Sequence, residues 1–103
     1  MDEKRSHRRV PLGAEVTCSR PNGARFVGNG RDISIGGMFV ESDEPVTFGD
    51  ELSIDVRLPG ARQSFALPAI VRWTGPGGFG VQFGLLGARE THAISELFRG
   101  GRA

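Results

Sequence analysis

Cysteine is almost absent from this chain, because Cys18 is the only one among 103 residues. A single cysteine cannot form an internal disulfide, and a reducing, cytoplasmic setting is the expected one. No apolar run approaches the roughly 20 residues of a membrane-spanning helix. The charged segment 1–9 also lacks the apolar stretch of a secretory signal. We therefore expect a cytoplasmic protein that does not insert into a membrane.

Histidine is equally scarce: His7 and His92 each stand alone, without a neighbouring histidine or cysteine at zinc-ligand spacing. Cys18 alternates with apolar residues, so we expect a packed thiol rather than a nucleophile. The glycine-rich segment 75–80 joins two expected strands, whereas a phosphate-binding loop precedes a helix. The acidic segment 41–55 lacks the ligand pattern of an EF-hand. These absences predict no enzyme, no metal site and no cofactor.

Tyrosine is missing altogether, and the net charge is only +1. Small barrels that bind single-stranded nucleic acid combine exposed aromatic side chains with a basic groove. Here most aromatic residues, Trp73 included, are expected to face inward, and no nucleic-acid partner is predicted. Lysine is limited to Lys4, so almost every basic residue is arginine. Arginine suits bidentate contacts with phosphate and with the edge of guanine.

The apolar residues that are present alternate with period two along most of the chain. This pattern predicts six short strands, at residues 10–18, 24–35, 38–40, 52–58, 65–73 and 79–83. After the last strand, apolar residues at helical spacing predict a short amphipathic helix that ends at Gly100-Gly101. Closing the sheet removes its exposed edges. The expected fold is therefore all-β, a six-stranded antiparallel β-barrel with a short C-terminal α-helix.

Three details of this assignment concern irregular backbone and domain limits. Pro11 and Gly13 predict an edge or a bulge in the first strand. The segment 28–30, Gly-Asn-Gly, predicts a bulge in the second. Residues 1–9 have no period and are expected to form a flexible arm, while residues 10–103 form the barrel and its helix.

Two local patterns remain as candidates for a binding site. Arg5 and Arg9 lie four residues apart in the arm, where two guanidinium groups can close over an anionic ligand. The second pattern is Asp32-x-Ser34-x-x-Gly37. Alternation on an inward-facing Ile33 and Ile35 places Asp32 and Ser34 outward, side by side. Taken alone, the first pattern is most often a solvated tail and the second a hairpin turn with local hydrogen bonds.

Taken together, the two patterns resemble the signatures of the PilZ domain, a bacterial receptor module for cyclic di-GMP. The family motifs are R-x-x-x-R and [D/N]-x-S-x-x-G, matched here by residues 5–9 and 32–37, and the second starts 23 positions after the first ends. Residues 9–12, 71–73 and 79–83 are also similar to the family's first and late strands. The resemblance extends over nearly the whole chain.

The resemblance implies that Arg5 and Arg9 engage guanine and phosphate, that Asp32 and Ser34 contact the ligand from the barrel, and that Gly37 shapes the turn. Arg8 precedes the second arginine of the motif, so Arg8 either replaces or supplements Arg9. The implied ligand is cyclic di-GMP, as one nucleotide or as an intercalated pair.

The function implied is that of a single-domain cyclic di-GMP receptor and adaptor. Its arginine arm becomes ordered over the nucleotide and signals through contacts with an unidentified effector protein. The alternative is a PilZ-like adaptor that acts through protein contacts without binding nucleotide. Neither the process controlled nor the oligomeric state follows from the sequence.

Overall fold

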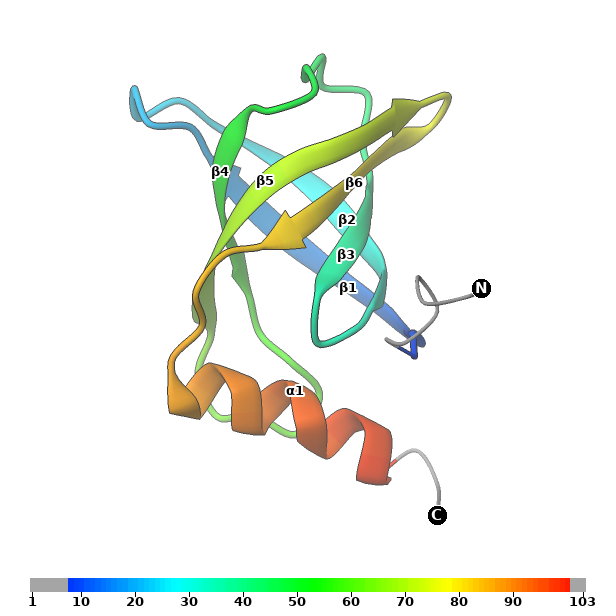
Figure 1. Ribbon diagram of the computed structural model, residues 1–103, viewed down its shortest axis with the longest axis vertical. Coiled ribbons are helices and arrows are strands. Elements are labelled where there is room, and N and C mark those ends of the chain that lie inside the picture. Colours follow the sequence, from blue (N-terminus) through cyan, green and yellow to red (C-terminus); the bar gives the residue numbers. More distant parts are fainter. Residues whose placement is uncertain (1–7, 101–103) are drawn as a thin grey trace.

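A computed structural model describes residues 8–100 (Figure 1). The chain forms six strands followed by one helix, as the alternation predicts. These elements are β1 (Val10–Ser19), β2 (Arg25–Ile33), β3 (Gly37–Glu41), β4 (Glu51–Val56), β5 (Phe65–Gly75), β6 (Gly78–Phe83) and α1 (Ala88–Gly100). Arg5, and most of the predicted flexible arm with it, lies outside the described residues, so that prediction stays untested.

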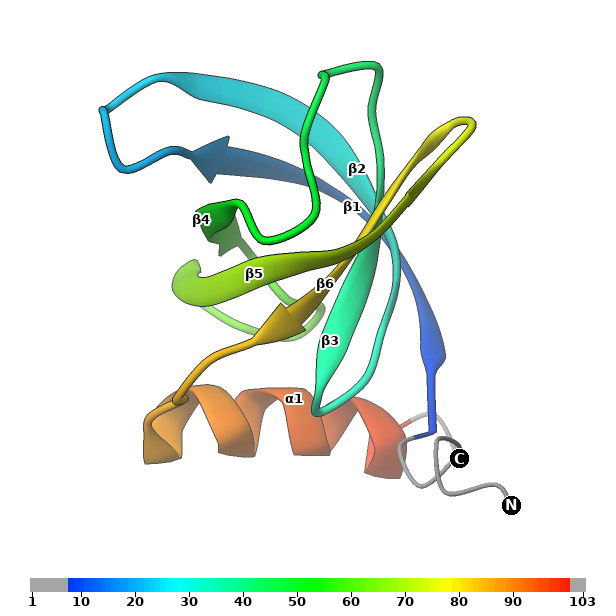
Figure 2. The same ribbon diagram turned by 45° about the horizontal axis from the view of Figure 1, so that its top comes forward.

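The sheet is a closed barrel in which every neighbouring pair of strands is antiparallel. Its strand order is β1-β2-β3-β6-β5-β4, and β4 pairs with β1 to close the circle. The helix α1 lies across the lower end of the barrel, below the loops that leave β4 and β6 (Figures 1 and 2). The predicted all-β class, with a six-stranded antiparallel barrel and a C-terminal helix, is confirmed.

The core fills the barrel with the inward residues of each strand. In β4, for example, Leu52, Ile54 and Val56 are buried while the residues between them are exposed. The helix adds Ile94, which is fully buried against the barrel's lower end. Together these inward residues form one contiguous core: Val16, Cys18, Ile33, Met38, Val40, Leu52, Ile54, Val56, Leu58, Leu67, Ala69, Val71, Phe79, Val81, Phe83 and Ile94.

The strand register shifts at three places. The shift between Pro11 and Ala14 surrounds Gly13, whose φ of 63° requires glycine, so the bulge predicted in β1 is confirmed. The irregularity of β2 lies between Gly30 and Asp32, just after the predicted segment 28–30. Both shifts place an extra residue in the strand and redirect the side chains that follow it.

The third shift lies in β5, between Val71 and Trp73, and the alternation did not reveal it. An extra residue at a bulge moves the following side chains to the other face of the sheet. Trp73 is consequently 51% exposed. The prediction that Trp73 belongs to the core is wrong.

The segment between β2 and β3 also departs from the prediction. The strand ends at Ile33, so Ser34 no longer follows the alternation, and it is 1% exposed. Its hydroxyl oxygen accepts hydrogen bonds from the backbone N–H groups of Gly36 and Gly37, both at 3.1 Å. The expectation of an outward-facing Ser34 beside Asp32 is therefore wrong, because the hydroxyl closes the turn instead.

Gly37 is the first residue of β3 and pairs with β6. A Cβ atom on Gly37 would overlap the carbonyl oxygen of Val81. The glycine is needed because two backbones approach closely there. The space beside its Cα is filled by β6 and is not left open for a ligand.

Candidate functional site

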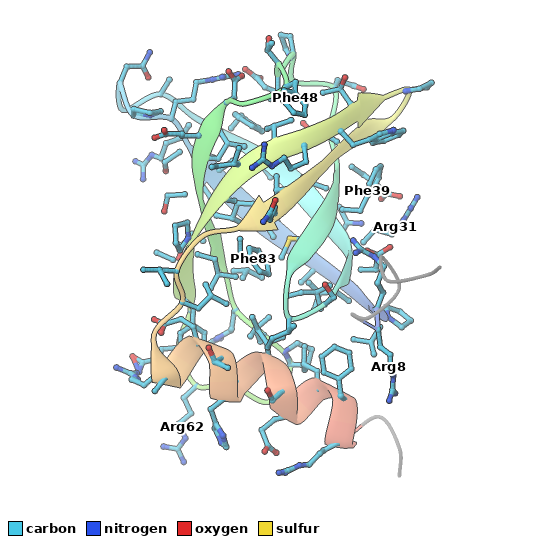
Figure 3. The ribbon with its side chains drawn as sticks, in the orientation of Figure 1. Arg8, Arg31, Phe39, Phe48, Arg62 and Phe83 are labelled. Carbon is cyan, nitrogen blue, oxygen red and sulfur yellow. The ribbon has the colours of Figure 1, made fainter. Side chains whose placement is uncertain are left out.

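An open hollow of about 380 Å³ lies on the outside of the barrel wall, where β2, β3, β5 and β6 meet the residue that precedes β1. It is lined by Arg9, Arg31, Asp32, Phe39, Trp73 and Gly80. Both sequence motifs contribute to it, through Arg9 from the first and Asp32 from the second. Figure 3 shows Arg31 and Phe39 together on this side of the molecule.

Arg9 and Asp32 form the electrostatic centre of the hollow. The Nε atom of Arg9 donates to Oδ1 of Asp32 at 3.1 Å, and its Nη2 atom lies 3.0 Å from the same oxygen. The other carboxylate oxygen, Oδ2, lies 3.6 Å from Nε of Arg31. The prediction that Asp32 faces outward is confirmed. Its carboxylate also pairs with Arg31. One carboxylate thus holds two guanidinium groups in place.

Two aromatic rings form the floor beside this charged group. The ring centroids of Phe39 and Trp73 are 5.7 Å apart, with an angle of 48° between the planes. The guanidinium carbon of Arg31 lies 4.2 Å from the centroid of Phe39. Gly75 leaves room for the indole, since a Cβ atom on Gly75 would overlap it. The indole of Trp73, which is partly exposed, can stack on a purine base.

Arg8 points elsewhere. Its guanidinium carbon lies 5.7 Å from the ring centroid of Phe98, in the last turns of α1 (Figure 3). Adjacent arginines therefore serve different places, with Arg9 at the hollow and Arg8 at the helix. This arrangement favours Arg9 as the second arginine of the motif.

Three side chains of the hollow, those of Arg31, Phe39 and Trp73, were not predicted from the sequence. Phe39 was recoverable, because it alternates with the inward Met38 and Val40 and so had to face outward. Arg31 adjoins the second motif but carries no pattern of its own. Trp73 was hidden by the bulge in β5.

Elsewhere in residues 8–100, Cys18 is a free cysteine that is buried in the core. Burial raises the pKa of the Cys18 thiol to about 11, although the positive charge of Arg20 opposes the shift. The thiolate that nucleophilic chemistry requires is thus disfavoured. Within residues 8–100, no group of three His, Cys, Asp or Glu side chains is arranged to hold a metal ion. In the same range, no helix is both long and apolar enough to cross a membrane.

The family model of the PilZ domain matches residues 3–100 of the chain. No curated protein matches the sequence.

Solved structures share the fold at low sequence identity. The PilZ domain of CeSA from a cellulose-synthesizing bacterium is 20% identical with a TM-score of 0.71, and the match covers 93% of this chain and 99% of that one. The PilZ domain of YcgR from Escherichia coli, solved with c-di-GMP, is 17% identical with a TM-score of 0.70, covering 97% and 95%. The Bacillus subtilis inhibitor of motility MotI/DgrA is 18% identical with a TM-score of 0.73, covering 95% of this chain and 51% of that protein.

Proposed function

Because the chain belongs to the PilZ domain family, we propose that it is a receptor for cyclic di-GMP, which it binds in the hollow between Arg9, Asp32 and Trp73. The observation that carries the proposal is the Arg9–Asp32 pair. It joins the two motifs, 23 residues apart in sequence, at one place on the barrel. The family relative YcgR, of the same fold, has been solved with this nucleotide.

Each side of the hollow matches a part of the ligand. A guanidinium group forms bidentate contacts with phosphate oxygens or with the N7 and O6 atoms of guanine. The carboxylate of Asp32 can accept from guanine N1–H and N2–H₂. The indole of Trp73 offers a stacking surface, which is worth about 1–3 kcal/mol per base. Cyclic di-GMP presents both guanines and phosphates, so one ligand uses all three groups.

Binding requires Arg9 to share or leave Asp32. The Arg9 side chain is 48% exposed, and a pair at that exposure contributes about 0–1 kcal/mol. A charge-assisted hydrogen bond from arginine to a ligand phosphate contributes about 1.5–3 kcal/mol. The exchange of the carboxylate for phosphate is therefore favourable, and the existing pair holds Arg9 near its point of use.

The N-terminal arm, residues 1–9, completes the proposed site and transmits the signal to a partner. On binding, Arg8 leaves Phe98 and closes over the nucleotide together with Arg5 and Arg9, and this ordered arm forms a new surface for an effector protein. Ser34 and Gly37 support the site by fixing the turn that follows Asp32. The alternative is an adaptor that contacts its partner without nucleotide. The presence of every motif residue favours the receptor.

Titration calorimetry tests the proposal on the purified chain. We expect heat of binding with cyclic di-GMP and none with GTP or cyclic AMP at the same concentrations. Arg9→Ala should weaken binding about tenfold to a hundredfold, and Arg8→Ala should weaken it less. A larger loss for Arg8→Ala would show that the motif register is wrong. A flat trace at tens of micromolar nucleotide would favour the nucleotide-independent adaptor.

A further inference from the structure

A second hollow, of about 550 Å³, lies at the lower end of the barrel between the β4–β5 connection and the first half of α1. It is larger than the hollow at Arg9, yet it contains none of the motif residues. Figure 3 places Arg62, on its rim, at the lower left, well away from Arg31 and Phe39. The two hollows share no lining residue.

The floor of this hollow is apolar. Leu58 is buried at its base, and Ala61, Phe65 and Ala93 are half-buried around it. The polar side chains of the lining are all exposed. The floor therefore fits an apolar side chain better than a small hydrophilic molecule.

The rim of the hollow is basic. Arg62, Arg89 and His92 are exposed along it, and within the described part of the chain no carboxylate lies within 4 Å of either arginine. The guanidinium carbon of Arg89 lies 6.0 Å from the ring centroid of Phe65. The one acidic residue of the lining, Glu96, lies 3.8 Å from His92. Two guanidinium groups thus remain available above an apolar floor.

We propose that this hollow is a docking site for an acidic segment of a partner protein, which inserts one apolar side chain between carboxylates. An apolar centre surrounded by polar residues, with arginine enriched, is the usual anatomy of a protein interface. The rim arginines select carboxylates by charge and increase the association rate. A nucleic-acid backbone would leave the apolar floor unfilled and would meet Glu96.

The residues that line this hollow take no part in the proposed nucleotide site, so the docking proposal goes beyond the proposed function. Partner docking and nucleotide binding can therefore be tested, and can fail, separately.

The test is selection from a random-peptide phage library against the full chain, followed by amide-shift mapping of the selected peptides. We expect enriched peptides to carry Asp or Glu around a Leu or Phe, and to perturb amides of residues 58–65 and 88–96. Arg62→Glu and Arg89→Glu should each weaken these peptides at least about tenfold. Arg89→Glu places an acidic residue in the first turn of α1, which favours the helix, so the variant is expected to fold.

Arg25→Glu is the matched control, because Arg25 is exposed on β2 and lies outside this hollow; it should leave peptide affinity unchanged. Arg9→Ala should weaken the binding of cyclic di-GMP and leave the affinity for the peptides unchanged, which separates this proposal from the preceding one. The docking site would be overturned if the selected peptides were basic or uncharged, or if Arg62→Glu bound the acidic peptides as tightly as the wild-type chain does. It would also be overturned if the peptides perturbed amides elsewhere in the chain, or if a single-stranded oligonucleotide perturbed the same amides.

Discussion

At the scale of single residues, Asp32 organises the hollow at Arg9. Its carboxylate holds Arg9 on one oxygen and Arg31 on the other, while its own side chain is 22% exposed. Arg31 in turn lies over Phe39. A ligand guanine that hydrogen-bonds to this carboxylate would therefore release the guanidinium groups of Arg9 and Arg31 to contact the ligand phosphates.

Asp32→Ala should separate this binding role from a structural one. The variant leaves guanine donors unpaired in the complex, which weakens cyclic di-GMP binding by about 1–3 kcal/mol, or about tenfold to a hundredfold. Stability should change by no more than about 0.5 kcal/mol, because the two arginine side chains that pair with Asp32 are about half exposed. Calorimetry and thermal melting on one sample measure both. A melting temperature lowered by several degrees with unchanged affinity per folded molecule would contradict the assignment.

Trp73 should contribute to affinity through stacking. Trp73→Ala is expected to weaken cyclic di-GMP by about 1–3 kcal/mol while the barrel stays folded, since the side chain is half exposed. Phe48→Ala is the matched control, because Phe48 is 64% exposed and lies outside the hollow. Calorimetric titration of both variants measures the difference. If Trp73→Ala bound cyclic di-GMP as tightly as the wild-type chain does, Trp73 would not stack on the ligand.

At the scale of elements, the turn between β2 and β3 supports the site from below. Ser34 accepts two backbone N–H groups, of which that of Gly37 is buried. The backbone N–H of Ser34 also donates to the carbonyl of Gly37 at 2.8 Å. The turn fixes the end of β2 and thereby the direction of Asp32.

Ser34→Ala should therefore destabilise the fold more than Asp32→Ala does. Loss of the hydroxyl leaves a buried N–H without an acceptor, at about 1–3 kcal/mol. Urea unfolding followed by circular dichroism measures the free energy of unfolding of both variants. If Ser34→Ala keeps full stability and loses affinity as strongly as Asp32→Ala, the hydroxyl contacts the ligand directly and its structural role is wrong.

Alternation along the strands was sufficient to predict the barrel and the position of Asp32. It failed where an element ends or gains a residue. Ser34 lies one position beyond β2, where a side chain is free to turn inward, and Trp73 follows a bulge that no glycine or proline marks. A bulge of this kind depends on the pairing of β5 with β6, which the local pattern does not contain.

At the scale of the whole molecule, the two hollows lie at different places on the barrel and share no residue. The hollow at Arg9 uses β2, β3, β6 and the later part of β5, whereas the hollow at Arg62 uses the β4–β5 connection, the start of β5 at Phe65, and α1. Arg8 extends from the start of β1 to Phe98 near the end of the helix. The start of β1 and the end of α1 therefore lie on the same side of the barrel (Figure 2).

The stability of the whole domain should fall in alkaline solution because of Cys18. Folding raises the pKa of the Cys18 thiol from 9.0 to about 11. Below pH 9 the thiol is mainly neutral in both the folded and the unfolded chain. Between pH 9 and 11 the thiol ionises mainly in the unfolded chain, which stabilises the unfolded state. The expected loss at pH 10 is about 1 kcal/mol. Urea unfolding at pH 8 and pH 10 measures it, and Cys18→Ala should lack this pH dependence. The same alkaline loss in Cys18→Ala would assign it to another group.

Amide-shift mapping of the isotopically labelled chain with cyclic di-GMP shows directly where the nucleotide binds. We expect perturbation at Arg9, at residues 31–39 and at the backbone and indole N–H of Trp73, with residues 58–65 unaffected. Saturating nucleotide that left these signals unchanged, or that perturbed residues 58–65 and 88–96 instead, would contradict the proposed site.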